Sequence, residues 1–347
     1  MPWHRERVRV RRVEAGDEAA LAEVAAIWSL VDRQDFPSLG TFGPNDLRAF
    51  AAHEGTVRRF HLFAAGEQRG PTAGVALMEV PLRDNRHSAE LVSVTVHPER
   101  RRHGAGRALV EHAVALGLAD SRRVLNCIVD IPLGQRSTHP SVGFARAVGF
   151  EPTLGGNKRV LRVPLERERV DELQAFTARV SGAERYRTFT FRTPWPEEYT
   201  DDRCELARRM STDEPTGDSN HEEEVWDAQR IRETDDLLAA QRSIKLAAVA
   251  QHVESGRLVA FTELLLSPDR PGEAWQMATL VHPEHRGHRL GLAVKLANLE
   301  FLAEAEPSIR QVVTSNASVN EPMIAINDML GFDIVGEGWF WQKPLHS

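Results

Sequence analysis

One stretch of the sequence occurs twice, and this repeat limits the chain to two copies of one kind of domain. HPERRRHGAGRALVEHA fills 97–113 and HPEHRGHRLGLAVKLANLE fills 282–300. Arg101 and Arg286 are 185 positions apart, as are Gly106 and Gly291. Each copy follows a strand-like run, AELVSVTV or AWQMATLV, and then begins an apolar-periodic helix. The sequence therefore indicates a tandem duplication.

The similarity between the two halves extends beyond these stretches. TAGVALMEVPL at 72–82 resembles GRLVAFTELLL at 256–266, and both read as strands with a glutamate inside. A Gly-Phe pair follows near the end of each copy, at 149–150 and 331–332. Strands alternating with helices in both halves predict an α/β protein.

The segment between the halves is typical of a connecting helix. Four apolar residues recur there at helical spacing on one face, namely Val170, Leu173, Phe176 and Val180. Gly182 follows as a plausible helix stop. We predict an N-terminal domain at 1–165, a linking helix at 166–182 and a C-terminal domain at 183–347.

Composition excludes several classes of function. The chain has 43 Lys and Arg against 50 Asp and Glu, and this net charge of −7 argues against a general nucleic-acid binder. Cys127 and Cys204 form neither a CxxC motif nor a disulfide framework. No apolar run approaches the roughly 18 residues of a membrane helix, and the basic start lacks the apolar core of a signal peptide. We expect a cytoplasmic protein with no membrane or nucleic-acid partner.

A glycine-rich turn between a strand and a helix is suited to phosphate binding. Its backbone N–H groups point in one direction, the helix N-terminus adds partial positive charge, and flanking arginines can pair with further phosphates. Neither copy has the Lys-Ser/Thr pair of a P-loop, and the preceding strands lack the context of a dinucleotide fold. The spacing of His282, His285 and His288 fits no common metal motif, so no metal is expected.

VTVHPERRRHGAGRAL resembles the acyl-CoA-binding motif of the GNAT superfamily of N-acetyltransferases, in which [RQ]-x-x-G-x-[GA] follows a strand end. Arg101, Gly104 and Gly106 fill its three positions. The resemblance implies two GNAT-like domains, each a mixed, mostly antiparallel sheet flanked by helices, in an arrangement similar to that of mycothiol synthase. It also implies that the turns hold the pyrophosphate of acetyl-CoA. The implied cofactor-binding residues are Val96, Arg101, Arg102, His103, Gly104, Ala105, Gly106 and Arg107 in the first copy, and Val281, Arg286, Gly287, His288, Arg289, Gly291 and Asn320 in the second.

The second copy departs from the motif at one position. Arg289 stands where the motif has its first glycine. The side chain could obstruct the cofactor, or Gly287 could supply the flexibility while Arg289 points outward to help bind phosphate. The sequence leaves both alternatives open.

Acyl transfer to an amine needs a general base close to the thioester, because only the neutral amine attacks. Glu79 and Glu263 occupy matching places in otherwise apolar strands and are the first candidates, although each could simply lie on the open face of a half-buried strand. Glu90 is a further candidate, and the second half has Trp275 near the matching position.

The resemblance also implies where a general acid and a contact to the pantetheine arm of the cofactor should lie. Many superfamily members carry a tyrosine four residues before the Gly-Phe glycine, where this chain has Ala145 and Asn327. The missing tyrosine either removes ordinary catalysis or leaves the role to Asn327, another donor or water. Asn320 matches the asparagine that contacts the pantetheine arm in many relatives, and Thr138 is its counterpart in the first half.

These observations predict an acetyl-CoA-dependent N-acetyltransferase that acts on a small-molecule amine, with either half as the catalytic one. The alternative is a catalytically silent acyl-CoA-binding or regulatory protein. The resemblance implies that the first two helices of each half shape the acceptor site. There the acidic segment at 213–227 could attract a cationic amine or simply be solvated. The sequence predicts neither the acceptor nor the oligomeric state.

Overall fold

The computed structural model describes residues 8–35, 42–68, 70–213 and 221–346. These residues form two compact units. Of the described residues, the first unit contains 8–156 and 336–346, and the second contains 157–213 and 221–335. Within this part of the chain, no helix is both long and apolar enough to cross a membrane.

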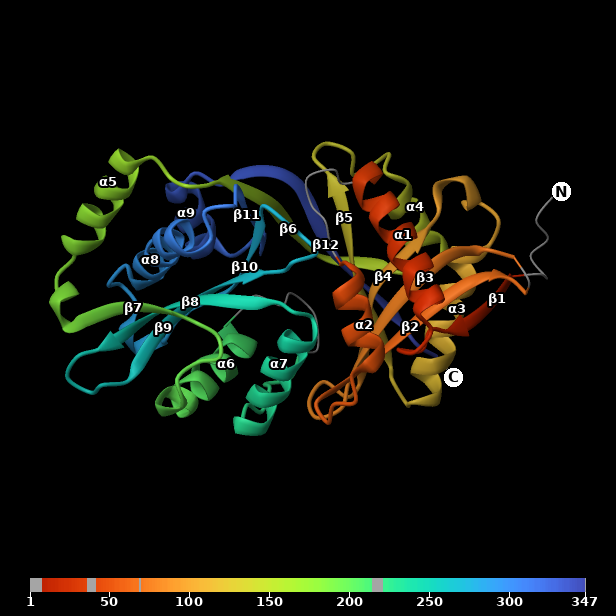
Figure 1. The fold of residues 1–347 in the computed structure, drawn as a ribbon, viewed down its shortest axis with the longest axis horizontal. Helices are drawn as coiled ribbons and strands as arrows, with labels where there is room; N and C mark the ends of the chain where they lie inside the picture. The colour runs from red at the N-terminus through yellow and green to blue at the C-terminus, as the bar shows by residue number, and fades with distance from the viewer. Residues whose placement is uncertain (1–7, 36–41, 69, 214–220, 347) are drawn as a thin grey trace. The chain divides into compact units, whose positions relative to one another are not determined.

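The same order of helices and strands occurs in both repeats (Figure 1). The first repeat contains β1 (Val8–Arg12), α1 (Glu18–Asp35), α2 (Pro44–Ala52), β2 (Arg58–Glu67), β3 (Thr72–Pro81), β4 (Ser88–Val96), α3 (Ala105–Ala119), β5 (Val124–Pro132), α4 (Pro140–Ala147) and β6 (Glu151–Arg162). The second contains, after α5 (Arg167–Ala178), the elements β7 (Tyr186–Arg192), α6 (Thr200–Asp213), α7 (Ala228–Ala240), β8 (Ile244–His252), β9 (Leu258–Leu266), β10 (Glu273–Val281), α8 (Leu290–Ala305), β11 (Gln311–Ala317), α9 (Glu321–Leu330) and β12 (Asp333–Pro344). Short 3-10 helices lie at Pro98–Arg100, Ala183–Arg185, Glu197–Tyr199 and Pro283–His285.

The last strand of each repeat crosses from its own unit into the other. Residues 336–344 of β12 pair antiparallel with β5, so the C-terminal strand completes the sheet of the first unit. Residues 157–162 of β6 belong to the second unit. The strand order is β1-β2-β3-β4-β5-β12 in the first unit and β6-β11-β10-β9-β8-β7 in the second. The compact units therefore differ in their terminal strands from the contiguous domains that the sequence predicts.

Each sheet contains one parallel pair that is short. Residues 88–90 of β4 pair with 124–126 of β5, and β4 then bulges against β3 beyond Leu91. Residues 273–275 of β10 pair with 311–313 of β11, and β10 has its own irregularity between Gln276 and Thr279. A bulge bends its strand away from regular pairing. Each unit therefore has a place where two parallel strands separate in mid-sheet.

Helices cover both faces of each sheet, because alternate strand residues point to opposite sides. In the first unit, α3 and α4 share a core with Met78 and its alternate neighbours, while α1 and α2 contact β3 and β2. In the second unit, leucines of α8 pack with Leu246, whereas Leu206 of α6 packs with Ala247. Figure 1 shows α8 and α6 on opposite sides of the strands β8 and β9. These layers confirm the predicted fold class of mixed, mostly antiparallel sheets flanked by helices.

A helix is present where the linking helix was predicted, and it packs on the second unit. Val170 and Leu173 are buried in the same core cluster as Leu296 of α8. Phe176 is 39% exposed, and Val180 lies beyond the end of α5. The apolar face of α5 is therefore shorter than the sequence pattern indicates.

Candidate functional site

The first glycine-rich turn joins β4 to α3 through two residues in the left-handed backbone region. The φ angle is 68° at Arg102 and 95° at Gly104. Helix α3 begins at Ala105 with no side-chain cap on its first N–H groups. Uncapped N–H groups at a helix N-terminus carry partial positive charge, so this backbone can hold an anionic group.

The last glycine of each motif allows two helices to approach closely. A Cβ on Gly106 would lie 3.0 Å from Phe144 Cζ of α4 and 3.4 Å from Val96 Cγ2. A Cβ on Gly291 would likewise lie 3.0 Å from Ile326 Cδ1 of α9 and 3.6 Å from the valine Cγ2 at the end of β10, Val281. The predicted residues Val96 and Val281 therefore lie directly beneath the two turns.

The motif arginines bind protein groups. Nε of Arg101 donates to the Val96 carbonyl oxygen at 3.2 Å, and Nη2 lies 2.9 Å from a carboxylate oxygen of Asp35. Arg286 repeats this pattern with the carbonyl oxygen at the end of β10 and with Asp213. Since the two aspartates are the last residues of α1 and α6, each arginine fixes a strand end to a helix. Direct phosphate binding by these two side chains stays a prediction.

The second turn exchanges glycine and arginine between its two left-handed positions. The φ angle is 84° at Gly287 and 57° at Arg289. The Arg289 guanidinium lies 3.6 Å from the centroid of the Phe176 ring and donates to the Phe176 carbonyl oxygen. Its side chain is therefore held by α5, which counts against the alternative in which it obstructs the cofactor. That Arg289 helps to bind phosphate stays a prediction.

The other predicted cofactor residues lie around the turns. His103 is partly buried and Ala105 is buried in the first turn. Arg107 donates to a carbonyl oxygen at the end of α4 at 3.1 Å. His288 contacts a carbonyl oxygen that follows α5 at 3.1 Å, and Asn320 caps α9 by accepting from the Met323 N–H at 3.3 Å. Their contact with a cofactor stays a prediction.

Two glutamates meet on one face of the first sheet, where β4 and β5 stop pairing. Glu79 of β3 and Glu90 of β4 are directly opposite each other, so their side chains share a face. Arg58 Nη1 donates to Glu79 Oε1 at 3.0 Å. Burial and, after it, the Glu79 charge together raise the pKa of Glu90 to about 7, against the opposing effect of Arg58. This carboxyl group can therefore exchange a proton near neutral pH.

Asn126 extends this group across to β5. It is the partner of Glu90 in the parallel pair, at the last position before the strands separate. Its Oδ1 is buried and accepts no hydrogen bond from the described residues. Arg58 and Asn126 are absent from the sequence-based candidates, because only the strand register brings them beside the glutamates.

Glu263, the counterpart of Glu79, has a different environment. Its Oε1 accepts from Trp195 Nε1 at 2.9 Å, and its Oε2 lies 2.8 Å from Lys245 Nζ. Burial alone would raise the pKa of Glu263, but Lys245, Arg203 and these two hydrogen bonds together hold it below the usual value. A carboxylate that is buried, paired and ionised is a weak proton acceptor at neutral pH.

The two positions that match the general-acid tyrosine both point into the core. Ala145 of α4 is buried in the core of the first unit. Asn327 is fully buried in the second, where its Oδ1 accepts from Lys295 Nζ at 2.7 Å and its Nδ2 donates to Asn316 at 3.3 Å. Burial, reinforced by the Arg159 charge, lowers the pKa of Lys295 to about 7. In this arrangement Asn327 belongs to a buried polar network, and its proposed catalytic role stays a prediction.

The acidic segment that follows α6 is extensively paired with arginines. Asp213 binds Arg286, Glu223 binds Arg208, and Glu224 lies 2.8 Å from Arg230. Glu214 and Asp218, which belong to the same predicted segment, fall outside the described residues, as does 36–41 in the corresponding part of the first repeat. The pairing favours a locally neutralised segment over a field that attracts cations.

The histidines of the second turn lie closer together than their spacing suggests. One ligand-type atom from each of His282, Glu284 and His285 falls within a 4.8 Å group. His285 Nδ1 is 3.0 Å from the Tyr186 hydroxyl, and burial lowers the pKa of His285. The expectation that no metal binds here stays a prediction.

Comparison with protein families gives one match. Residues 27–150 match the model of the acetyltransferase (GNAT) family. This range includes the first turn, both glutamates and the first Gly-Phe pair. No curated protein sequence matches the chain significantly.

Solved structures match over both repeats. A tandem GNAT protein from the clavulanic acid biosynthesis pathway, solved without acetyl-CoA, is 26% identical and has a TM-score of 0.80, with 98% of this chain and 99% of that chain covered. A GCN5-related N-acetyltransferase from Sphaerobacter thermophilus is 15% identical and has a TM-score of 0.61, with 99% and 97% covered. The similarity therefore includes the tandem arrangement as well as the single repeat.

Proposed function

We propose that this chain, an acyltransferase of tandem GNAT architecture, transfers an acetyl group from acetyl-CoA to the primary amine of a small molecule, and that its first unit performs the chemistry. The observation that carries the assignment is the position of Glu90. It faces Glu79 where β4 and β5 separate, and its pKa is raised to about 7. The second unit has Trp275 at that position.

The first turn fits the pyrophosphate of acetyl-CoA. Gly104 adopts the left-handed backbone conformation, the first N–H groups of α3 have no side-chain cap, and Gly106 leaves no side chain between α3 and α4. Arg102 is exposed beside them, and among the described residues its guanidinium has no acidic partner. Backbone donors would hold the phosphates and Arg102 would add charge. Bound acetyl-CoA would supply an activated thioester carbonyl.

Glu90 would act as the general base. Its carboxylate would accept the proton that the amine loses, directly or through one water, and the pKa near 7 keeps a large fraction of it ionised at neutral pH. Arg58 binds Glu79 and so fixes the neighbouring carboxylate. The unpaired Asn126 Oδ1 would accept a hydrogen bond from the amine.

The second unit lacks these features and would serve as a structural partner. The Glu263 carboxylate is neutralised by Lys245. The side chain of Gln276 fills the bulge of β10, where its Nε2 donates to Thr262 Oγ1 at 2.9 Å and to the Glu263 carbonyl oxygen at 3.0 Å. These hydrogen bonds tie the irregular part of β10 to its neighbour β9.

A second candidate function is acyl-CoA binding without catalysis. It is favoured by the buried Ala145 and Asn327 at the positions of the general acid. Under this alternative the turns would keep their phosphate-binding role while no amine is acylated.

Two measurements on the full chain test the proposal: the first separates the two functions, and the second tests the cofactor site that both of them require. Release of free thiol from acetyl-CoA, followed with a panel of primary amines, should be amine-dependent for the enzyme and absent for the binder. Calorimetric titration with acetyl-CoA should show binding that Gly106→Glu abolishes, because the new side chain collides with Phe144 and carries negative charge. Binding that persists unchanged in Gly106→Glu would refute the assignment of the first turn.

A further inference from the structure

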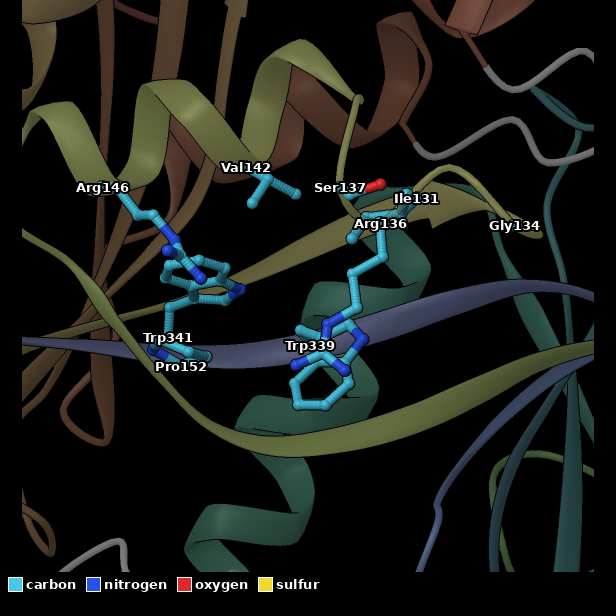
Figure 2. A pocket seen from close by; sticks show the side chains of 9 residues that line it. All are labelled: Ile131, Gly134, Arg136, Ser137, Val142, Arg146, Pro152, Trp339 and Trp341. Carbon is cyan, nitrogen blue, oxygen red and sulfur yellow. The ribbon is translucent and has the colours of Figure 1, made fainter.

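The first unit contains a cavity that the proposed reaction does not use. Its volume is about 370 Å³, and it lies between α4, β5 and β12 (Figure 2). Side chains two positions apart on a helix point about 200° apart. Phe144 of α4 faces Gly106 and the cofactor turn, whereas Val142 and Arg146 face the cavity. The cavity and the turn are therefore on opposite sides of α4 and share no residue.

Aromatic side chains form much of the cavity wall. Trp339 and Trp341 are both from β12, and Ile131 and Val142 add aliphatic surface. A Cβ on Gly155 of β6 would lie 2.9 Å from the Trp339 ring, so this glycine lets the ring lie directly on the strand. Such walls favour a ligand with a planar apolar part.

Two guanidinium groups accompany the tryptophans. The Arg136 Cζ atom lies 3.5 Å from the centroid of the Trp339 ring, and the Arg146 Cζ atom lies 5.9 Å from that of Trp341. Throughout the described residues, neither arginine has an acidic partner or a hydrogen bond to protein. Both are exposed and can turn toward an anion.

Trp341 provides an independent sign of a missing partner. Its side chain is 3% exposed, and its Nε1–H donates to no acceptor in the part of the chain that the structure describes. By contrast, Trp339 Nε1 donates to Glu337 at 2.8 Å. Figure 2 shows the Trp341 nitrogen on the side of its ring that faces Trp339 and Arg136. A buried donor without an acceptor is unfavourable, and a ligand oxygen would satisfy it once a neighbouring side chain turns aside and opens this atom to the cavity.

We propose that this cavity is a second ligand site, separate from the cofactor turn, for a planar aromatic or heteroaromatic acid. The ring packs against Trp341 and takes the place of the Arg136 guanidinium on Trp339, Arg136 turns to pair with the acid group together with Arg146, and an oxygen of the ligand accepts from Trp341 Nε1. The inference rests on the cavity alone and does not require that the chain acylates an amine.

Calorimetric titration of the full chain with 2-naphthoate tests the proposal. Two matched probes, 2-naphthamide and cyclohexanecarboxylate, lack the charge and the aromatic ring respectively. We expect 2-naphthoate to bind at least about tenfold more tightly than either probe, and Arg136→Met and Arg146→Met each to weaken it about tenfold. Arg33→Met, which removes an exposed arginine of α1, is the control and should leave the affinity unchanged. Equal affinity for the three probes, or no effect of both cavity variants, would overturn the proposal.

The NMR signal of the Trp341 indole N–H provides a second readout, because binding of the probe elsewhere on the surface would not shift it. In a ¹⁵N spectrum, the Nε1–H resonance of Trp341, assigned by its loss in Trp341→Phe, should shift on addition of 2-naphthoate, while that of the buried Trp28 should not. Saturation with coenzyme A should leave the 2-naphthoate affinity unchanged. Competition by coenzyme A, or a Trp341 signal that does not shift, would show that the cavity is not a separate acid site.

Discussion

Glu90 gives the proposed reaction a specific pH dependence. Because burial and the Glu79 charge raise its pKa to about 7, the carboxylate is lost as pH falls through 7, and kcat/KM should fall with it. Glu79→Gln removes the neighbouring negative charge and frees Arg58, and both changes lower the pKa of Glu90. The acid limb of the pH–rate profile should therefore move to lower pH. A limb that stays in place would show that another group controls it.

Lys245 and Glu263 provide a stability prediction in the second unit. Both side chains are nearly buried, at 11% and 7% exposed, so Lys245→Met leaves a buried carboxylate without its counter-charge. The free energy of unfolding should fall by about 3 kcal/mol. Lys245→Met combined with Glu263→Gln removes both charges, keeps an acceptor for Trp195, and should recover much of the loss. Denaturant unfolding of the three proteins measures this, and additive losses would contradict the ion-pair assignment.

At the residue scale, the sequence predicts residue types in a turn better than it predicts their partners. Gly104 is required by its left-handed φ angle, and Gly106 is required by the close approach of α4. Both positions lie within the turn and the helix that follows it. Glu79 and Glu263 look equivalent in the sequence, yet one faces Glu90 and the other faces Lys245. That difference depends on residues of neighbouring strands, which no periodicity specifies.

At the scale of elements, the contact between α3 and α4 determines the shape of the first turn. A Cβ on Gly106 would be 3.0 Å from Cζ at the far end of the Phe144 ring, so Gly106→Ala should displace this ring and weaken acetyl-CoA binding by up to about tenfold. Phe144→Ala removes the colliding ring, so the double variant should regain most of the affinity. Calorimetry checks this, and a double variant as weak as Gly106→Ala would contradict the packing explanation.

The order of elements follows from the sequence, but the pairing of the last strands does not. Strands β6 and β12 occupy the same position at the end of their repeats. From the order of elements alone, either strand could pair with β5 or with β11. The linking helix accounts for the observed pairing of β6 with β11. Strand β6 continues directly into α5, and α5 packs on α8 of the second unit through Val170 and Leu173. Trp341 of β12 then fills the core of the first unit.

At the scale of the whole molecule, the strand exchange predicts that neither repeat is an independent domain. A chain cut after 165 retains β5 but loses β12, which leaves a long strand edge unpaired and removes the buried Trp341. Residues 1–165 alone should be insoluble or unfolded, and co-expression with 166–347 should restore a soluble complex. Size-exclusion chromatography and circular dichroism check this, and a folded, monomeric 1–165 would contradict the exchange.

The central claim is that the first unit performs the chemistry through Glu90, and one variant tests it most directly. Glu90→Gln keeps the size of the side chain and removes its basicity, so amine-dependent thiol release should fall by a factor of about 10² to 10⁴. Its acetyl-CoA affinity should stay at the level of the unaltered chain, because the turn at 101–106 is untouched. Glu151→Gln, an exposed carboxylate at the start of β6, is the matched control and should keep full activity. Unchanged turnover in Glu90→Gln would contradict the account and move the search for the base elsewhere.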